Sequence, residues 1–92
     1  MVLKKRKLGT TDLWVTELGL GAMDTPNSPC AESTVHEALD SGINFIDTAR
    51  IYKNSEYLLG QVIRARGLID FYIASKTINR SAAGVQYDID NV

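Results

Sequence analysis

The chain has 92 residues, of which 45% are hydrophobic and 23% charged, and its formal net charge at pH 7 is −1. This composition is that of an ordinary globular domain and excludes a disordered chain, which would need fewer apolar residues and more net charge. A net charge this small creates no overall field toward nucleic acid or a membrane surface, so we expect neither as a partner.

A single cysteine, Cys30, excludes an internal disulfide bond and fits a reducing cytoplasm, which is the location we expect. No apolar run approaches the roughly 20 residues of a membrane-spanning helix. The charged N-terminus is not followed by the apolar segment of a signal peptide. We also expect no metal site.

The N-terminal segment is expected to form a β-hairpin, because residues 3–8 and 13–18 flank the turn-rich tetrad Gly9-Thr10-Thr11-Asp12. The first of these strands carries the basic run Lys4-Lys5-Arg6-Lys7. Lysines on an edge strand discourage pairing with other chains, which favours a solvated edge. A phosphate-binding patch is the alternative.

A strand and a helix are predicted next. The apolar run at residues 18–23 is the first candidate core strand, and Ser28 and Pro29 suit the N-cap and the first position of a helix. Gly42 fits the left-handed position after the last helical residue. The apolar face of this helix is expected to hold Thr34, Val35, Ala38 and Leu39, and the polar face Glu32, His36, Glu37 and Asp40.

Residues 43–46 are predicted to form the second core strand, with Asp47 at its end. Asn54 or Ser55 then caps a second helix, which ends at Gly67. The third core strand is expected at residues 71–74. The apolar stripe of the second helix consists of Leu58, Leu59, Val62 and Ile63.

The last segment carries Val85, Ile89 and Val92 at helical spacing, which predicts a third amphipathic helix that is still in progress at the last residue. No C-cap glycine follows. We therefore expect residues 1–92 to be part of a longer protein.

Strands that alternate with helices favour a parallel sheet. Because the carboxyl ends of parallel strands lie at one edge, Asp47, Tyr52 and Lys76 are expected to converge there. An ammonium group beside a phenol favours the phenolate, and an aspartate beside the lysine would hold that ammonium in place. Such a phenol could donate a proton to a carbonyl oxygen. The residues alone leave a plainer interpretation open: a turn aspartate, a loop aromatic and a surface lysine.

Three motifs resemble those of the aldo-keto reductase family. They are Leu8 to Val15 (LGTTDLWV) with Leu18 to Met23 (LGLGAM), Ala38 to Ala49 (ALDSGINFIDTA) running on to Tyr52, Asn54-Ser55-Glu56 and Leu59-Gly60, and Ile73 to Thr77 (IASKT). The likeness covers nearly the whole chain in order. Lys53, where many relatives have glycine, and the bulky Tyr57 depart from the pattern and could alter the substrate mouth.

The resemblance implies that the chain is the N-terminal part of a single α/β domain, a (β/α)8 barrel closed at the bottom by the hairpin. It implies a reductase of aldehydes, ketones or sugars that uses NADPH, or NADH in some members. Asp47, Tyr52 and Lys76 would be three members of a catalytic tetrad. Its histidine would follow a fourth strand that residues 1–92 lack, and His36, expected to be an exposed surface residue, is no substitute.

The resemblance also places the nicotinamide near Gly21, Ala22 and Met23, and the nicotinamide ribose near Asp47. Glycine lets the backbone approach a flat ring closely, although a plain strand glycine is the alternative. The dinucleotide itself rests on the resemblance alone, because no phosphate-binding glycine motif occurs in the chain.

Two other functions stay open. A non-catalytic regulatory subunit of the same fold would keep the cofactor site, as some channel subunits in the family do. A small, self-contained α/β binding module would be unrelated to barrels.

Overall fold

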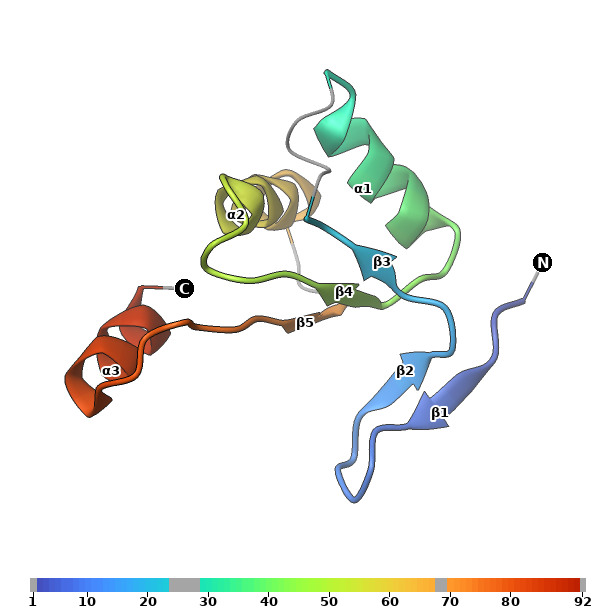
Figure 1. Ribbon diagram of the computed structural model, residues 1–92. Coiled ribbons are helices and arrows are strands. Elements are labelled where there is room, and N and C mark those ends of the chain that lie inside the picture. Colours follow the sequence, from blue (N-terminus) through green and yellow to red (C-terminus); the bar gives the residue numbers. More distant parts are fainter. Residues whose placement is uncertain (1, 24–28, 68–69, 92) are drawn as a thin grey trace.

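The computed structural model describes residues 2–23, 29–67 and 70–91 and shows a hairpin followed by alternating strands and helices (Figure 1). The strands are β1 (Lys5–Lys7), β2 (Trp14–Thr16), β3 (Leu20–Gly21), β4 (Phe45–Asp47) and β5 (Tyr72–Ala74), and the helices are α1 (Ala31–Asp40), α2 (Ser55–Arg66) and α3 (Ala82–Asp90). The order of elements is the predicted one, but each strand is shorter than the segment predicted for it. No described helix combines the length and apolar character needed to cross a membrane.

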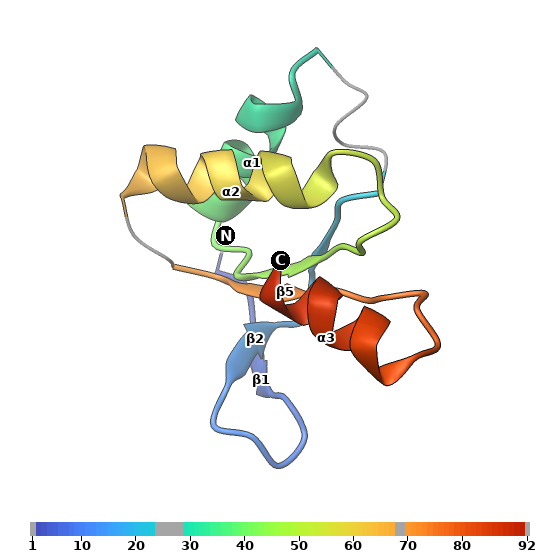
Figure 2. The same cartoon turned by 90° about the vertical axis from the view of Figure 1, so that its left-hand side faces the viewer.

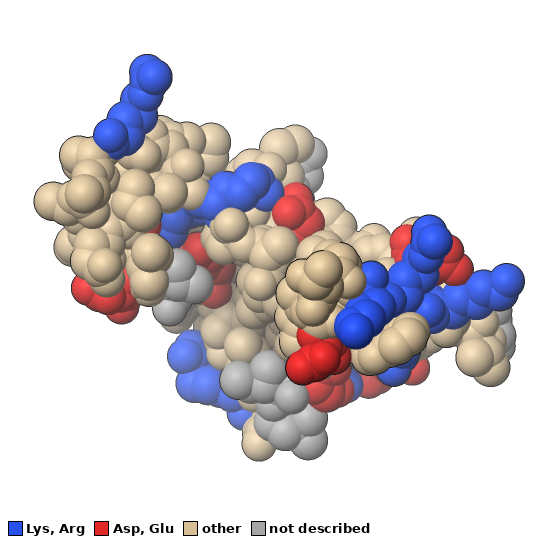
Figure 3. Space-filling model, turned by 90° about the horizontal axis from the view of Figure 1, so that it is seen from below, with Lys and Arg blue, Asp and Glu red and all other residues tan. Residues whose placement is uncertain are grey.

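The hairpin forms its own two-stranded sheet, in which β1 pairs antiparallel with β2 and Arg6 lies opposite Val15. The side chains of Lys4 to Lys7 are all exposed, as predicted for a solvated edge. Lys and Arg side chains gather at this end of the molecule, interspersed with acidic ones (Figure 3). An ion pair in this region joins the Arg6 guanidinium and the Glu17 carboxylate at 3.9 Å.

The second sheet is parallel, with the order β3-β4-β5. This confirms the pairing predicted from the alternation of strands and helices. Gly21, Asp47 and Ala74 are in register at the carboxyl ends of the three strands. Residues in register share a face, so Asp47 lies between Gly21 and Ala74 on one side of the sheet.

The hydrophobic core lies between this sheet and two helices, because α1 and α2 cover the same face (Figures 1 and 2). Both predicted apolar stripes supply it, except that Thr34 is exposed and the half-buried Ala38 is not part of the core. The buried cluster consists of Ala22, Val35, Leu39, Ile46, Leu58, Leu59, Val62 and Phe71.

The start of α1 differs from the prediction. Thr34 donates its N–H to the carbonyl of Cys30 at 2.9 Å, so Cys30 is the N-cap and the helix begins at Ala31 rather than at Pro29. The predicted cap, Ser28, lies outside the described residues. At the other end the prediction is confirmed, because Gly42 has a φ of 104°.

The ends of α2 are only partly as predicted. Gly67 ends it in the left-handed conformation, with a φ of 72°. Asn54 occupies the N-cap position, but its backbone is left-handed, with a φ of 62°, and its side chain makes no capping bond. Asparagine tolerates this conformation better than most residues. Ser55 is the first helical residue, and its side chain is completely buried.

The third helix packs differently from the prediction. Ser81 caps α3 by accepting the Gly84 N–H at 3.0 Å. The helix ends at Asp90. Val92, the last residue of the predicted apolar stripe, lies outside the described residues. The buried residue of α3 is Asp88, whereas Ile89 is 62% exposed. A carboxylate therefore attaches α3 where an apolar stripe was expected.

Candidate active site

The two ends of the parallel sheet have different neighbours. The Asn44 side chain, just before β4, accepts the Thr16 N–H at 2.7 Å and donates to the Trp14 carbonyl at 2.9 Å, which anchors the hairpin at the amino ends of the strands. Asp47 ends β4 at the opposite edge, and Lys76 follows β5 by two residues. The predicted site therefore lies at the carboxyl edge, away from the hairpin (Figure 1).

Asp47 and Lys76 form an ion pair at this edge. The Lys76 Nζ lies 3.0 Å and 3.1 Å from the two carboxylate oxygens of Asp47, and it also donates to the Thr48 carbonyl at 2.7 Å. The hydrogen bond to Asp47 raises the pKa of Lys76 above its ordinary value, with a further contribution from Tyr52. Lys76 therefore stays charged at neutral pH.

Tyr52 is the third member of the group. The Lys76 Nζ lies 5.3 Å from the centre of the Tyr52 ring, within the range of a cation–π contact. The Tyr52 backbone turns tightly, since its N–H donates to Ala49 and its carbonyl accepts from Ser55. The structure thus brings together the three residues singled out in the sequence, with one ammonium group between a carboxylate and a phenol.

A buried pair of hydroxyls supports the loop that carries Tyr52. The Thr48 and Ser55 hydroxyl oxygens are 2.5 Å apart, and Ser55 also donates to the Ala22 carbonyl at 3.0 Å. Both side chains are completely buried. These bonds join the first residue of α2 to the residue after β4 and to the residue after β3. They therefore hold both ends of the loop between β4 and α2.

The residues expected near a nicotinamide differ in what they could contact. A Cβ atom placed on Gly21 would meet nothing within 4 Å, and the adjacent Met23 is exposed, so a flat group could approach the backbone beside Asp47. The Ala22 side chain is buried in the core, while its N–H donates to Asp47 and its carbonyl accepts from Ser55. The Gly21 backbone and the exposed Met23 side chain thus leave room for a flat ring, whereas the Ala22 side chain is buried in the core. Cofactor contact at these positions stays a prediction.

His36 is less exposed than expected. This residue of α1 contacts α2 through its Nδ1, which lies 3.3 Å from the Arg66 guanidinium. Its Nε2 lies 3.6 Å from Glu32 of the same helix. Arg66 reaches across from α2 to bind Asp40 of α1, which covers the histidine. This placement on the helix-covered side gives His36 no contact with the Asp47 group.

The two departures from the family pattern lie on the surface. Lys53 is exposed, and Tyr57 is 65% exposed with a long contact of 3.5 Å from Gln61 to its hydroxyl. Neither side chain takes part in the ion pair between Asp47 and Lys76.

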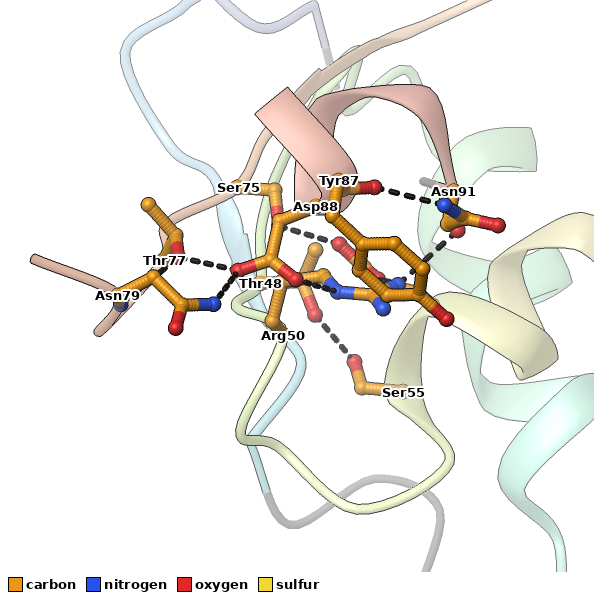
Figure 4. Close-up of polar contacts among 10 residues, drawn as sticks. Thr48, Arg50, Ser55, Ser75, Thr77, Asn79, Tyr87, Asp88 and Asn91 are labelled. Atoms are coloured by element: carbon orange, nitrogen blue, oxygen red, sulfur yellow. Dashed lines mark hydrogen bonds and ion pairs between the residues drawn. The ribbon is translucent and has the colours of Figure 1, made fainter. Parts of the chain in front are cut away.

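Three charged residues beside the site were not identified from the sequence: Arg50, Glu56 and Asp88. Arg50 and Asp88 are labelled in Figure 4. Glu56 belongs to a motif used for the family resemblance, but its spacing gave no indication of a partner. The sequence did hold one indication for Asp88. This carboxylate follows Val85 by three residues and precedes Ile89, so it lies close to the expected apolar stripe. Nothing in the sequence pattern indicated a role for Arg50.

Comparison with known proteins agrees with the geometry. A sequence model described as the aldo/keto reductase family matches residues 17–92. The chain belongs to the aldo/keto reductase family. The expectation of an unrelated α/β module is therefore wrong.

Two curated relatives are similar to this aldo/keto reductase sequence. The uncharacterized oxidoreductase YqkF of Bacillus subtilis is 41% identical over 81 residues, which cover 85% of this chain and 26% of the relative. The NADH-specific methylglyoxal reductase of Escherichia coli is 38% identical over 74 residues, covering 67% of this chain and 22% of the relative. The chain thus spans about a quarter of the length of these proteins.

The fold is that of part of a TIM barrel. The holo form of the aldo-keto reductase AKR11C1 from Bacillus halodurans superposes with a TM-score of 0.76 at 38% sequence identity, over 90% of this chain and 28% of the other.

Proposed function

We propose that residues 1–92 are the N-terminal part of one barrel domain, and that the whole protein reduces aldehydes or ketones to alcohols with NADPH or NADH. The observation that carries the proposal is the position of the Lys76 ammonium, bound to Asp47 and 5.3 Å from the Tyr52 ring centre. The trio lies at the carboxyl edge of a parallel sheet, where barrel enzymes build their active sites.

In this proposal Tyr52 donates a proton to the carbonyl oxygen of the substrate. Lys76 stabilises the phenolate that remains, and Asp47 holds Lys76 in place. A reduced nicotinamide, when bound beside Gly21 and Met23, supplies the hydride that adds to the carbonyl carbon. The products are the alcohol and the oxidised cofactor.

NADPH is the cofactor we expect, with NADH as the alternative. The Escherichia coli relative is an NADH-specific methylglyoxal reductase, so both nicotinamides belong in the test. The substrates we expect are small aldehydes, ketones or sugars. We place the protein in the cytoplasm.

The test is the substitution Tyr52→Phe in the complete protein that carries this sequence. Loss of a positioned proton donor should lower kcat for a test aldehyde by on the order of 10²- to 10⁴-fold. Cofactor affinity, measured by fluorescence titration with NADPH and NADH, should change little. A non-catalytic regulatory subunit would bind cofactor and reduce no carbonyl before or after the substitution.

The matched control is Tyr87→Phe, because Tyr87 is a tyrosine of α3 that is 63% exposed. We expect this variant to keep its activity. A Tyr52→Phe variant within twofold of the unaltered protein would contradict the assignment of the proton donor.

A further inference from the structure

Arg50 lies between two carboxylates from two helices. Its guanidinium donates to Glu56 of α2 at 3.0 Å and lies 3.3 Å from Asp88 of α3. It also donates to the Asn91 carbonyl at 3.0 Å (Figure 4). The planar guanidinium thus binds three acceptors at once, which a single ammonium group does poorly.

Each of the two carboxylates also binds a residue next to Lys76. The Ser75 hydroxyl donates to Glu56 at 2.6 Å, and the Thr77 hydroxyl donates to Asp88. Lys76 therefore lies in the chain between two residues that each bind an acidic partner of Arg50.

Arg50 also contacts Lys76 through the backbone. Its N–H donates to the Lys76 carbonyl at 2.9 Å. Arg50 follows Asp47 by three residues and precedes Tyr52 by two. One residue thus connects the loop after β4 with the segment after β5.

From this arrangement we infer that Arg50 is a positioning residue, which keeps the Lys76 ammonium between Asp47 and Tyr52 by fixing the residues on both sides of Lys76. The inference rests on the proposed function of the same site. Arg50 itself contacts none of the three catalytic side chains in the bonds described.

The environment makes these bonds stronger than those of a surface ion pair. The Arg50 side chain is 27% exposed, and its partners Glu56 and Asp88 are 16% and 11% exposed. Hydrogen bonds between charged groups are shorter and stronger than neutral ones, and limited contact with water reduces their screening. The bonds from Thr77 and Asn79, followed by Arg50, hold the pKa of Asp88 below its ordinary value, so the carboxylate stays charged.

A purely structural role is the competing explanation, since the same bonds attach α3 to the rest of the chain. The two roles differ in what happens at Lys76. If Arg50 only attaches α3, its loss lowers stability and leaves the ion pair between Lys76 and Asp47 unchanged. If Arg50 positions Lys76, its loss weakens that ion pair.

The experiment compares Arg50→Gln and Arg50→Lys in the complete protein. Removing the charge should lower kcat on the order of 10- to 100-fold, because displacement of a catalytic group by about 1 Å has effects of this size. The KM for the cofactor should change little. Arg50→Lys should recover only part of kcat, because lysine cannot bind three acceptors in the same geometry.

Arg66→Gln is the matched control. Arg66 is also an arginine with two acidic partners and is 17% exposed, but it joins α1 to α2 on the covered side of the sheet. It should lower stability and leave kcat within about twofold of the unaltered protein, since it touches no neighbour of Lys76.

A second readout does not depend on catalysis. In a lysine-labelled NMR titration, the pKa of Lys76 should fall toward its ordinary value in Arg50→Gln and stay raised in Arg66→Gln, because only the first change loosens the bond to Asp47. The pair Ser75→Ala and Thr77→Val, combined in one protein, tests the same links with Arg50 intact. Unchanged kcat and unchanged Lys76 titration in either folded variant would overturn the inference. Failure of the proposed function would show separately, as an unaltered protein without reductase activity.

Discussion

The Lys76 Nζ lies 3.0 Å and 3.1 Å from the two carboxylate oxygens of Asp47, although the two residues are 29 positions apart. The contact arises because Asp47 ends β4 and Lys76 closely follows β5, which pairs parallel with β4. Any strand pairing with this register would bring the same two residues together, so the ion pair is a direct result of the topology.

Replacement of Lys76 by methionine should lower kcat for carbonyl reduction by the complete protein. The physical reason is that the phenolate left after proton donation by Tyr52 would lose the cation that stabilises it. Lys7→Met serves as the control, because Lys7 is an exposed lysine of the hairpin, away from the ion pair between Asp47 and Lys76. An unchanged kcat in Lys76→Met would argue against the pairing of Tyr52 with Lys76.

The positions of the three site residues could be predicted because they depend on strand order alone. Asp47, Tyr52 and Lys76 lie at or after the carboxyl end of a strand, and parallel strands gather such residues at one edge. The network around Arg50 could not be predicted, because it depends on where α3 lies relative to α2. That position is set by tertiary packing, and helical periodicity does not report it.

The fold could be predicted for similar reasons, and the errors in that prediction have local causes. The apolar stripes of α1 and α2 identified the core, since both helices cover a sheet. The face of α3 was predicted wrongly because the hydrogen bonds available to Asp88 outweighed the burial of Ile89. The half-buried position of His36 was missed because Arg66 covers it from another helix.

Replacement of Ser55 by alanine should lower the free energy of unfolding by about 1–3 kcal/mol, the cost of leaving buried polar groups without partners. The change would remove the partner of the Thr48 hydroxyl and the donor to the Ala22 carbonyl, in a completely buried place. Urea unfolding measures the loss. Ser41→Ala, at an exposed serine whose hydroxyl donates to the Glu37 carbonyl, should change stability by no more than about 0.5 kcal/mol. Equal effects of the two substitutions would contradict the argument.

Replacement of Leu59 by alanine should lower the free energy of unfolding by about 2–5 kcal/mol, because it leaves a cavity where α2 packs against the sheet. Leu59 is 1% exposed. The control Ile78→Ala removes an aliphatic side chain that is 69% exposed, and should have little effect. Urea denaturation of both variants tests the position of the core, and a loss below about 1 kcal/mol for Leu59→Ala would place the core elsewhere.

Acid should weaken the attachment of α3. Hydrogen bonds from Thr77 and Asn79, and then Arg50, lower the pKa of Asp88 below its ordinary value. The ordinary value, which applies to the unfolded chain, is about 3.9. A lowered pKa in the folded state contributes stability above that value, and the contribution is lost as the pH falls through the folded pKa.

The comparison of Asp88→Asn with the unaltered chain isolates this effect, because Asp70 also has a lowered pKa and adds its own acid dependence to both proteins. The stability difference between the two, measured by urea unfolding, should be largest at neutral pH and shrink as the solution is acidified below about pH 4. A difference that is the same at neutral and acidic pH would show that the charge of Asp88 does not stabilise the fold.

Residues 1–92 expressed alone should show neither carbonyl reductase activity nor tight NADPH binding. The Asp47 and Lys76 side chains are each about half exposed, at 50% and 51%, so water screens the electrostatic interactions on which the proposed chemistry depends. The resemblance to the family assigns a catalytic histidine and the phosphate-binding loops to strands beyond these residues.

The isolated chain should also self-associate. Large apolar side chains remain exposed on the hairpin, on β5 and beyond it, including Trp14 at 55% and Ile73 at 39%. Burial stabilises apolar surface by roughly 25 cal/mol per Å², and surface that stays in water gains nothing. β3 and β5 are the edge strands of the parallel sheet and offer further sites for pairing between copies. Size-exclusion chromatography, NADPH fluorescence titration and an aldehyde reduction assay on the purified chain test these expectations together. A stable monomer that binds NADPH in the micromolar range would show that this part of the barrel is a self-sufficient cofactor domain, and the assignment of phosphate binding to other strands would then be wrong.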